Sequence, residues 1–175
     1  DVVLLAVTKT LPREAVVEAI GAGLTLFGEN RVQEAVTKYD GLLDRAKLHL
    51  IGHLQSNKAR LVPGVFSCVE SIDSLHTAQA LSRRVSAAGQ DCEVLLQYNS
   101  SREATKYGYT ESGALLADAS EITELPGLTV TGVMTIGPFT TDTSAIARAF
   151  EETRGVFERL KQEHGELIHT LSMGM

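Results

Sequence analysis

Seven short apolar runs alternate with helical patterns along the chain, and this alternation limits the possible folds more than any other feature. The runs are short and rich in β-branched residues, as strands are, whereas the segments between them carry apolar residues at helical spacing. The alternation predicts a parallel sheet in an α/β fold, either doubly wound or closed into a TIM barrel. The predicted strands are 2–8, 24–28, 48–53, 65–71, 93–99, 129–137 and 167–172.

Polar residues before several apolar stripes predict helix starts. Asn30 is placed to cap the helix that follows it, and Asp73 with Ser74 precedes another helix. Thr143 or Ser144 is expected to cap a longer helix, whose apolar stripe runs through 146–160.

Length and composition indicate one soluble domain. The chain has 175 residues, of which 43% are hydrophobic and 22% charged, and no linker divides it. A complete eight-stranded barrel usually takes about 250 residues. We therefore expect a single α/β barrel domain over residues 1–175 that lacks the eighth strand.

Charge and cysteine usage exclude several classes of partner. The net charge of -6, with scattered Lys and Arg, argues against a nucleic-acid partner. No apolar run approaches the roughly 20 residues of a membrane span, so we expect no membrane partner. Cys68 and Cys92 lack CxxC spacing, and Cys92 lies in an apolar run, which favours a buried inert thiol there. A reducing, cytoplasmic location is expected.

Lys9 closes the first apolar run, where parallel α/β folds gather their functional groups. A lysine there can lose solvation and offer a neutral amine for Schiff-base chemistry. Considered alone, a lysine just past a strand is more often a surface residue with a buried stem.

Two other kinds of site, a dinucleotide-binding loop and a histidine metal site, do not match the residue spacing of their known motifs. The glycines at 21, 23 and 28 do not match the dinucleotide fingerprint, because Leu26 occupies the place of the required third glycine. His49 and His53 are four residues apart but lack the glutamate of the HExxH pattern, so we expect no metal site. His49 remains either a ligand-binding residue or a satisfied core histidine.

Other predicted strands also end in residues suited to a ligand. Met134 either fills the core or packs against a planar ring. Ser172 and the backbone of Gly174 can approach a phosphate closely. The long polar connection at 99–108 is either a binding loop or a solvated turn.

Five ordered segments resemble the pyridoxal phosphate homeostasis proteins, single-domain relatives of the amino-terminal barrel of alanine racemase. They are AVTKT at 6–10, FGENRVQE at 27–34, HLIGHLQSNK at 49–58, GVMTI at 132–136 and LSMGM at 171–175. The resemblance implies a (β/α)8 barrel in which Lys9 forms the internal aldimine with pyridoxal 5'-phosphate (PLP). The other cofactor-binding residues that it implies, none of them catalytic, are Asn30, His49, Asn57, Met134, Ser172 and Gly174.

Parts of the family pattern are missing from residues 1–175. The family has a helix before the first strand, and after the methionine matching Met175 it has a serine, a Gly-Ser-Thr segment and a Val-Arg-Ile-Gly strand that bind the phosphate. We therefore expect the barrel to be truncated at both ends, with the phosphate-binding residues beyond Met175.

The function that the resemblance implies is PLP binding and homeostasis. We expect a cytoplasmic monomer that holds PLP reversibly on Lys9, without rapid amino-acid turnover and hence without enzyme activity. PLP-dependent apoenzymes or amino acids are the expected partners. The alternatives are a PLP-dependent amino-acid racemase or lyase, a class I Schiff-base aldolase, and a non-catalytic interaction barrel whose lysine is incidental.

Overall fold

Seven parallel strands pair in the order of the chain, each with its sequence neighbour. The computed structural model describes residues 2–174, so Met175, the last residue of the 171–175 segment, lies outside the described residues. All seven predicted strands are present. They are β1 (Ala6–Val7), β2 (Leu26–Glu29), β3 (Lys47–Leu50), β4 (Cys68–Ile72), β5 (Cys92–Gln97), β6 (Leu128–Ile136) and β7 (Thr170–Gly174).

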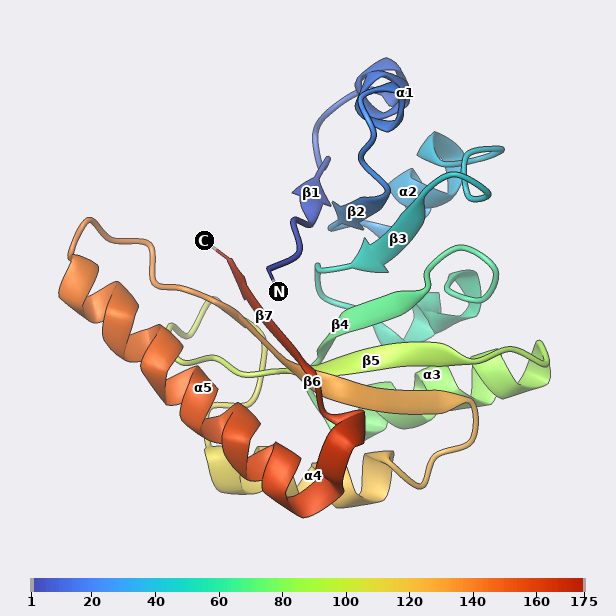
Figure 1. Cartoon of the computed structure of the whole chain (residues 1–175). Coiled ribbons are helices and arrows are strands. Elements are labelled where there is room, and N and C mark those ends of the chain that lie inside the picture. Colours follow the sequence, from blue (N-terminus) through green and yellow to red (C-terminus); the bar gives the residue numbers. More distant parts are fainter. Residues whose placement is uncertain (1, 175) are drawn as a thin grey trace.

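Helices connect consecutive strands and lie on the outer side of the curved sheet, whose concave side stays open (Figure 1). Parallel neighbours require such crossovers, because a tight turn cannot join parallel strands. The fold is the expected barrel type, present here as seven strands with β1 and β7 at the two ends of the sheet order. The helices are α1 (Arg13–Gly21), α2 (Val32–Lys38), η1 (Ser56–Leu61), α3 (Leu75–Ala87), α4 (Ser112–Ile122), α5 (Thr143–His164) and η2 (Gly165–Leu167), of which η1 and η2 are 3₁₀.

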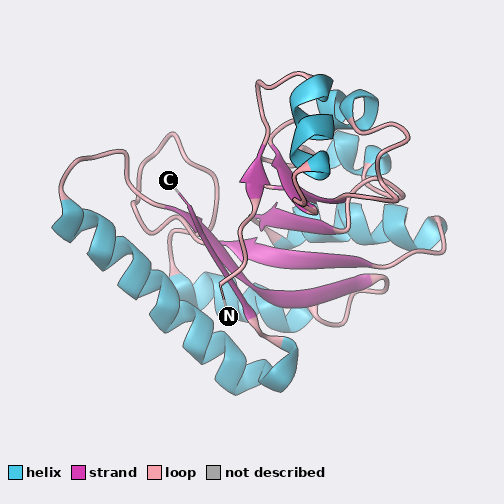
Figure 2. Cartoon of the chain, turned by 45° about the horizontal axis from the view of Figure 1, so that its top comes forward, coloured by secondary structure: helices cyan, strands magenta, loops and turns pink. Residues whose placement is uncertain are grey.

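The helices lie on one side of the sheet and leave the other side open (Figure 2). Two apolar clusters occupy the two faces of the sheet. The larger cluster joins strand residues to helix residues, such as Phe27 on β2 and Leu81 on α3, and is the core between sheet and helices. Cys68, Leu95 and Met134 form a separate cluster without any helix residue, which places it on the concave face. Side chains that alternate along each strand thus divide between a helix-covered core and an interior rim.

The first strand is shorter and more exposed than its apolar sequence predicts. Only Ala6 and Val7 pair with β2, and Val2, Val3 and Leu4 are 101%, 73% and 70% exposed. A continuous apolar run is typical of a strand buried on both faces. β1 differs because it lies at the edge of the sheet and has only one neighbour among residues 2–174.

Of the three predicted helix caps, one is the observed N-cap and two are not. Ser74 caps α3 by accepting a hydrogen bond from the Thr77 amide at 3.2 Å, as expected. Asn30 does not cap α2, whose N-cap is Arg31. The N-cap of α5 is Asp142, one residue before the predicted Thr143. A carboxylate at this position accepts two backbone amides and suits the positive end of a helix.

No helix within residues 2–174 is long and apolar enough to cross a membrane.

Gly132 allows β6 and β7 to approach each other closely. A Cβ at this position would lie 1.7 Å from the Thr170 carbonyl oxygen, which is far inside van der Waals contact. The two residues are register partners in the parallel pair. Since β7 carries Ser172, the position of one candidate site residue depends on this glycine.

We predict that Gly132→Ala lowers the free energy of unfolding by about 1–3 kcal/mol, because the backbone of β7 must move to make room. Urea unfolding followed by circular dichroism measures the change. Gly155→Ala is the matched control, since a Cβ on this exposed glycine of α5 meets no atom within 4 Å. It is expected to raise stability by up to about 1 kcal/mol. Equal effects of the two substitutions would contradict the prediction.

Candidate functional site

Lys9 lies in a tight turn directly after β1. The Leu11 amide donates to the Thr8 carbonyl at 3.0 Å, which places Lys9 and Thr10 at the two central positions of the turn. Thr10 has a φ of 69°, a value that glycine adopts easily and a β-branched residue rarely does. Lys9 itself is exposed. The structure therefore holds the lysine at the carboxyl end of β1 on a strained backbone.

A buried polar cluster, formed by Thr8, Glu29, Lys38 and Tyr39, fixes the residue before Lys9. The Thr8 hydroxyl donates to Glu29 Oε1 at 2.8 Å and, since its single proton is used there, accepts from the Tyr39 hydroxyl at 2.7 Å. Lys38 Nζ donates to Glu29 Oε1 at 2.7 Å and to the Thr8 carbonyl oxygen at 2.9 Å. Both the backbone and the side chain of Thr8 are therefore held in place.

Burial makes this cluster a strong anchor. Glu29 is fully buried, and its ion pair with Lys38 is among the least exposed in the described part of the chain. Burial raises the pKa of Tyr39 to about 12, so its hydroxyl stays protonated and remains a donor. Glu29 Oε2 is buried without a hydrogen-bond partner. Removing any charge-bearing partner would leave another charge buried and uncompensated.

Glu70 brings His49 and Ser172 together on the concave face. Its Oε1 lies 2.7 Å from Nδ1 of His49 on β3, and its Oε2 accepts a hydrogen bond from the Ser172 hydroxyl of β7 at 2.6 Å. Glu70 is on β4 and only 3% exposed. Because β5 and β6 separate β4 from β7 in the sheet, this carboxylate spans the interior of the barrel.

Met134 lies beside this group. It is the register partner of Ser172, is 3% exposed, and packs with Cys68 and Leu95. Cys68 is in turn the register partner of His49. Three of the predicted site residues, His49, Met134 and Ser172, thus share one region of the concave face.

The same region holds a possible set of metal ligands. Donor atoms of His49, Cys68 and Glu70 lie within 4.8 Å of one another. Burial raises the pKa of the Cys68 thiol well above its ordinary value, so the sulfur stays protonated, whereas a metal binds the thiolate. The His49–Glu70 hydrogen bond already satisfies two members of the set.

The remaining predicted residues lie at the rim without a contact that joins them to His49. Asn30 follows β2, and its backbone packs so tightly on Gly52 that a Cβ there would lie 2.2 Å from the Asn30 carbonyl oxygen. Asn57 is exposed on η1. Gly174 ends β7, where its carbonyl oxygen accepts from the Gly137 amide at 2.8 Å.

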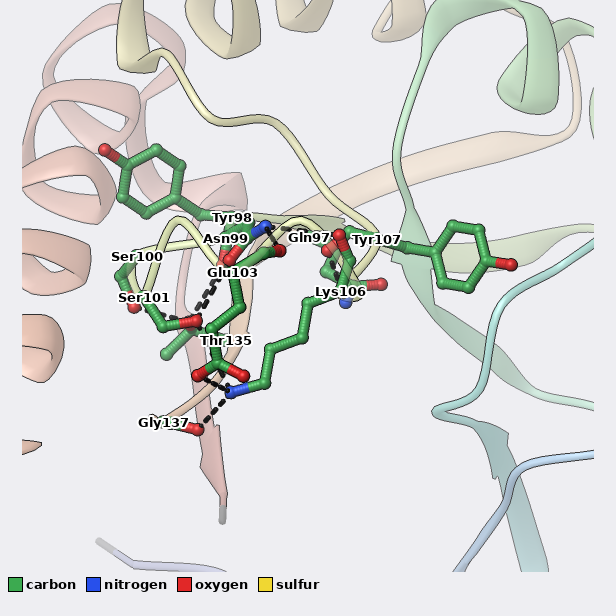
Figure 3. A network of polar contacts seen from close by, with 10 residues as sticks. All are labelled: Gln97, Tyr98, Asn99, Ser100, Ser101, Glu103, Lys106, Tyr107, Thr135 and Gly137. Carbon is green, nitrogen blue, oxygen red and sulfur yellow. Dashed lines mark hydrogen bonds and ion pairs between the residues drawn. The ribbon is translucent and has the colours of Figure 1, made fainter. Parts of the chain in front are cut away.

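The long polar connection at 98–111 is an ordered part of this rim (Figure 3). Asn99 donates to the carbonyl oxygens of Glu103 and Lys106, which closes the loop on itself. Lys106 Nζ then reaches the Gly137 carbonyl oxygen at 2.7 Å, just beyond β6. On the other side, Tyr107 stacks on His53 with ring centroids 3.7 Å apart. The loop therefore ties the ends of β5 and β6 to the segment after β3.

Sequence reasoning missed the two buried carboxylates, Glu29 and Glu70. Each is a charged residue in a short apolar strand: Glu29 is the last residue of β2, and Glu70 follows Val69 on β4. A charge in a run that is otherwise buried was the available signal, because such a residue needs a partner. The sequence did not identify the partner residues, because they lie on other segments of the chain.

A model of the alanine racemase N-terminal domain family matches residues 2–175. A pyridoxal phosphate homeostasis protein of Vibrio alginolyticus is 41% identical over 180 residues, which cover the whole chain and 76% of that protein. The protein of the same description from Escherichia coli K12 is 39% identical, again over the whole chain and 76% of that protein.

Solved structures agree in fold. PipY of Synechococcus elongatus, 34% identical, matches with a TM-score of 0.92 without PLP and 0.88 with PLP bound; the match covers 99% of this chain and 82% of PipY. An alanine racemase of Clostridium difficile has a TM-score of 0.82 at 13% identity, covering 97% of this chain and 47% of that one, which supports the fold alone. On the family match and the close relatives together, the chain belongs to the pyridoxal phosphate homeostasis protein family, within the wider family of alanine racemase N-terminal domains.

Proposed function

We propose that this chain binds PLP reversibly through Lys9 and serves PLP homeostasis in the cytoplasm without rapid amino-acid turnover. The observation that carries the proposal is the exposed amine of Lys9, held on an anchored turn at the end of β1. Lys38 and Lys106, by contrast, are committed to ion pairs with Glu29 and Glu103. An amine outside such a pair is available to an aldehyde.

The residues of the site fit the cofactor. A planar ring with polar substituents requires an amine, hydrogen-bonding side chains and an apolar surface, which Lys9, His49, Ser172 and Met134 supply. PLP itself supplies the aldehyde and an electron-withdrawing ring. Asn30, Asn57 and the Gly174 backbone remain proposed contacts at the same rim.

Each residue has a separate task in this proposal. Lys9 provides the nucleophile, and the Thr8 anchor keeps its backbone at the rim. His49 and Ser172 provide hydrogen-bonding groups with fixed orientation, since both are bound to Glu70. Met134 provides a buried apolar wall. The loop at 98–111 borders the rim on one side, through the contacts of Lys106 with Gly137 and of Tyr107 with His53.

Release to PLP-dependent apoenzymes or to amino acids, and a monomeric state, are part of the proposal. The relatives named as pyridoxal phosphate homeostasis proteins favour this function over a racemase or lyase. The likeness to alanine racemase rests on 13% identity and carries the fold only.

We predict that Lys9→Ala abolishes saturable labelling by PLP. Protein is mixed with PLP, reduced with borohydride and mapped by peptide mass spectrometry; the wild type should carry the adduct on Lys9. Lys47→Ala is the control, because Lys47 is an exposed lysine at the opposite, amino-terminal end of β3. It should label like the wild type. Equal labelling of the Lys9→Ala variant would refute the proposal, and trapping of a keto substrate instead of PLP would favour the aldolase.

We also predict that Glu29→Gln lowers the free energy of unfolding by about 3 kcal/mol, because it leaves Lys38 buried without its counter-charge. Labelling of Lys9 should slow as well, since a neutral amide holds Thr8 and Lys38 more weakly than the carboxylate does. Urea unfolding and timed borohydride trapping measure the two effects. Glu34→Gln, which breaks the exposed Arg31–Glu34 pair, should change neither. An unchanged urea midpoint for Glu29→Gln would count against the anchor.

A further inference from the structure

Glu70 is the buried carboxylate in contact with two proposed cofactor-binding residues at once. His49 has 17% of its side chain exposed, whereas the side chain of Glu70 is 4% exposed. Ser172 is half-buried. Glu70 therefore lies behind the two residues that reach the open concave face.

An ionised carboxylate accepts hydrogen bonds and donates none. The proton in the 2.7 Å contact with His49 must then be on Nδ1, which leaves Nε2 as the nitrogen not used by Glu70. The Ser172 hydroxyl donates its single proton to Glu70. Toward a ligand it can therefore act only as a hydrogen-bond acceptor. One buried side chain thus sets the hydrogen-bonding direction of both neighbours.

We propose that Glu70 is a positioning residue of the PLP site: it holds His49 in the Nδ1-protonated form and Ser172 as a hydrogen-bond acceptor. The inference rests on the proposed function. It argues against a phosphate beside Ser172, which the sequence allowed to approach one closely, because an oxygen that offers lone pairs repels an anion. Ser172 instead faces a hydrogen-bond donor of the cofactor.

Glu70→Gln tests this with little change in shape. The glutamine can keep both hydrogen bonds in two ways. Its oxygen can accept from Ser172 while its amide group donates to His49 Nδ1, which puts the His49 proton on Nε2; or its oxygen can accept from His49 Nδ1 while its amide group donates to the Ser172 oxygen, which frees the Ser172 proton for a ligand. The variant therefore preserves the packing and both contacts but reverses the direction of one of them, which a purely structural role would not require.

The first readout is heteronuclear NMR of the imidazole nitrogens in the cofactor-free protein, at a pH where histidine is neutral. The proton of His49 should be on Nδ1 in the wild type, because an ionised carboxylate can only accept. A proton on Nε2 in the wild type would overturn the inference whatever the protein does with PLP.

The second readout is the affinity for PLP. Loss of a charge-assisted hydrogen bond should weaken binding by about tenfold to a hundredfold in Glu70→Gln. In a His49→Ala, Ser172→Ala background the same substitution should have much less effect, because the residues through which it acts are gone. Equal losses in the two backgrounds would contradict the inference.

Controls separate this inference from the proposed function. Glu93→Gln alters an exposed carboxylate on the neighbouring β5 and should leave both the tautomer and the affinity unchanged. Thermal unfolding checks that each variant is folded. If the wild type takes up no PLP on Lys9, the proposed function fails; if it does so and Glu70→Gln binds equally well, only the role of Glu70 fails.

Discussion

Parallel pairing of consecutive strands is the constraint on which the rest of this structure depends. Because every strand runs in the same direction, the carboxyl ends of all seven meet at one rim, and residues distant in sequence become neighbours. Lys9 follows β1, whereas His49 lies within β3 and Ser172 within β7, so the site draws on three different strands. The register also decides which side chains face the concave interior and which face the helices.

Two buried carboxylates hold residues of the rim in place through hydrogen bonds. Burying either carboxylate without a partner would cost several kcal/mol of desolvation. Each carboxylate instead accepts hydrogen bonds from more than one segment of the chain, which compensate that cost. Glu29 holds Thr8 and thereby the backbone before Lys9, on the helix side of the sheet. Glu70 holds His49 and Ser172 on the concave side. The amine and the pocket wall are therefore positioned by independent networks on opposite faces.

The fold was predictable to a large extent, and the site in part. All seven strands occur where apolar runs indicated, since burial of β-branched residues is a local signal. The strand limits differ most at β1, where an apolar run does not reveal that the strand lies at the edge of the sheet. Asn30 was wrong as a helix cap because the backbone at 30 packs on Gly52. Of the proposed site residues, the structure joins His49, Met134 and Ser172, and it leaves Asn57 exposed on η1.

By itself, the sequence determined the βα alternation, the position of Lys9 at the end of the first strand, and the motifs that mark the family. Those features are local, because they depend on composition and on spacing within one element. Only the tertiary structure decided which groups the charged residues Glu29 and Glu70 contact. Their hydrogen bonds join residues 21 positions apart in one case and 102 in the other, and such pairs form through sheet register and closure, which no single segment contains.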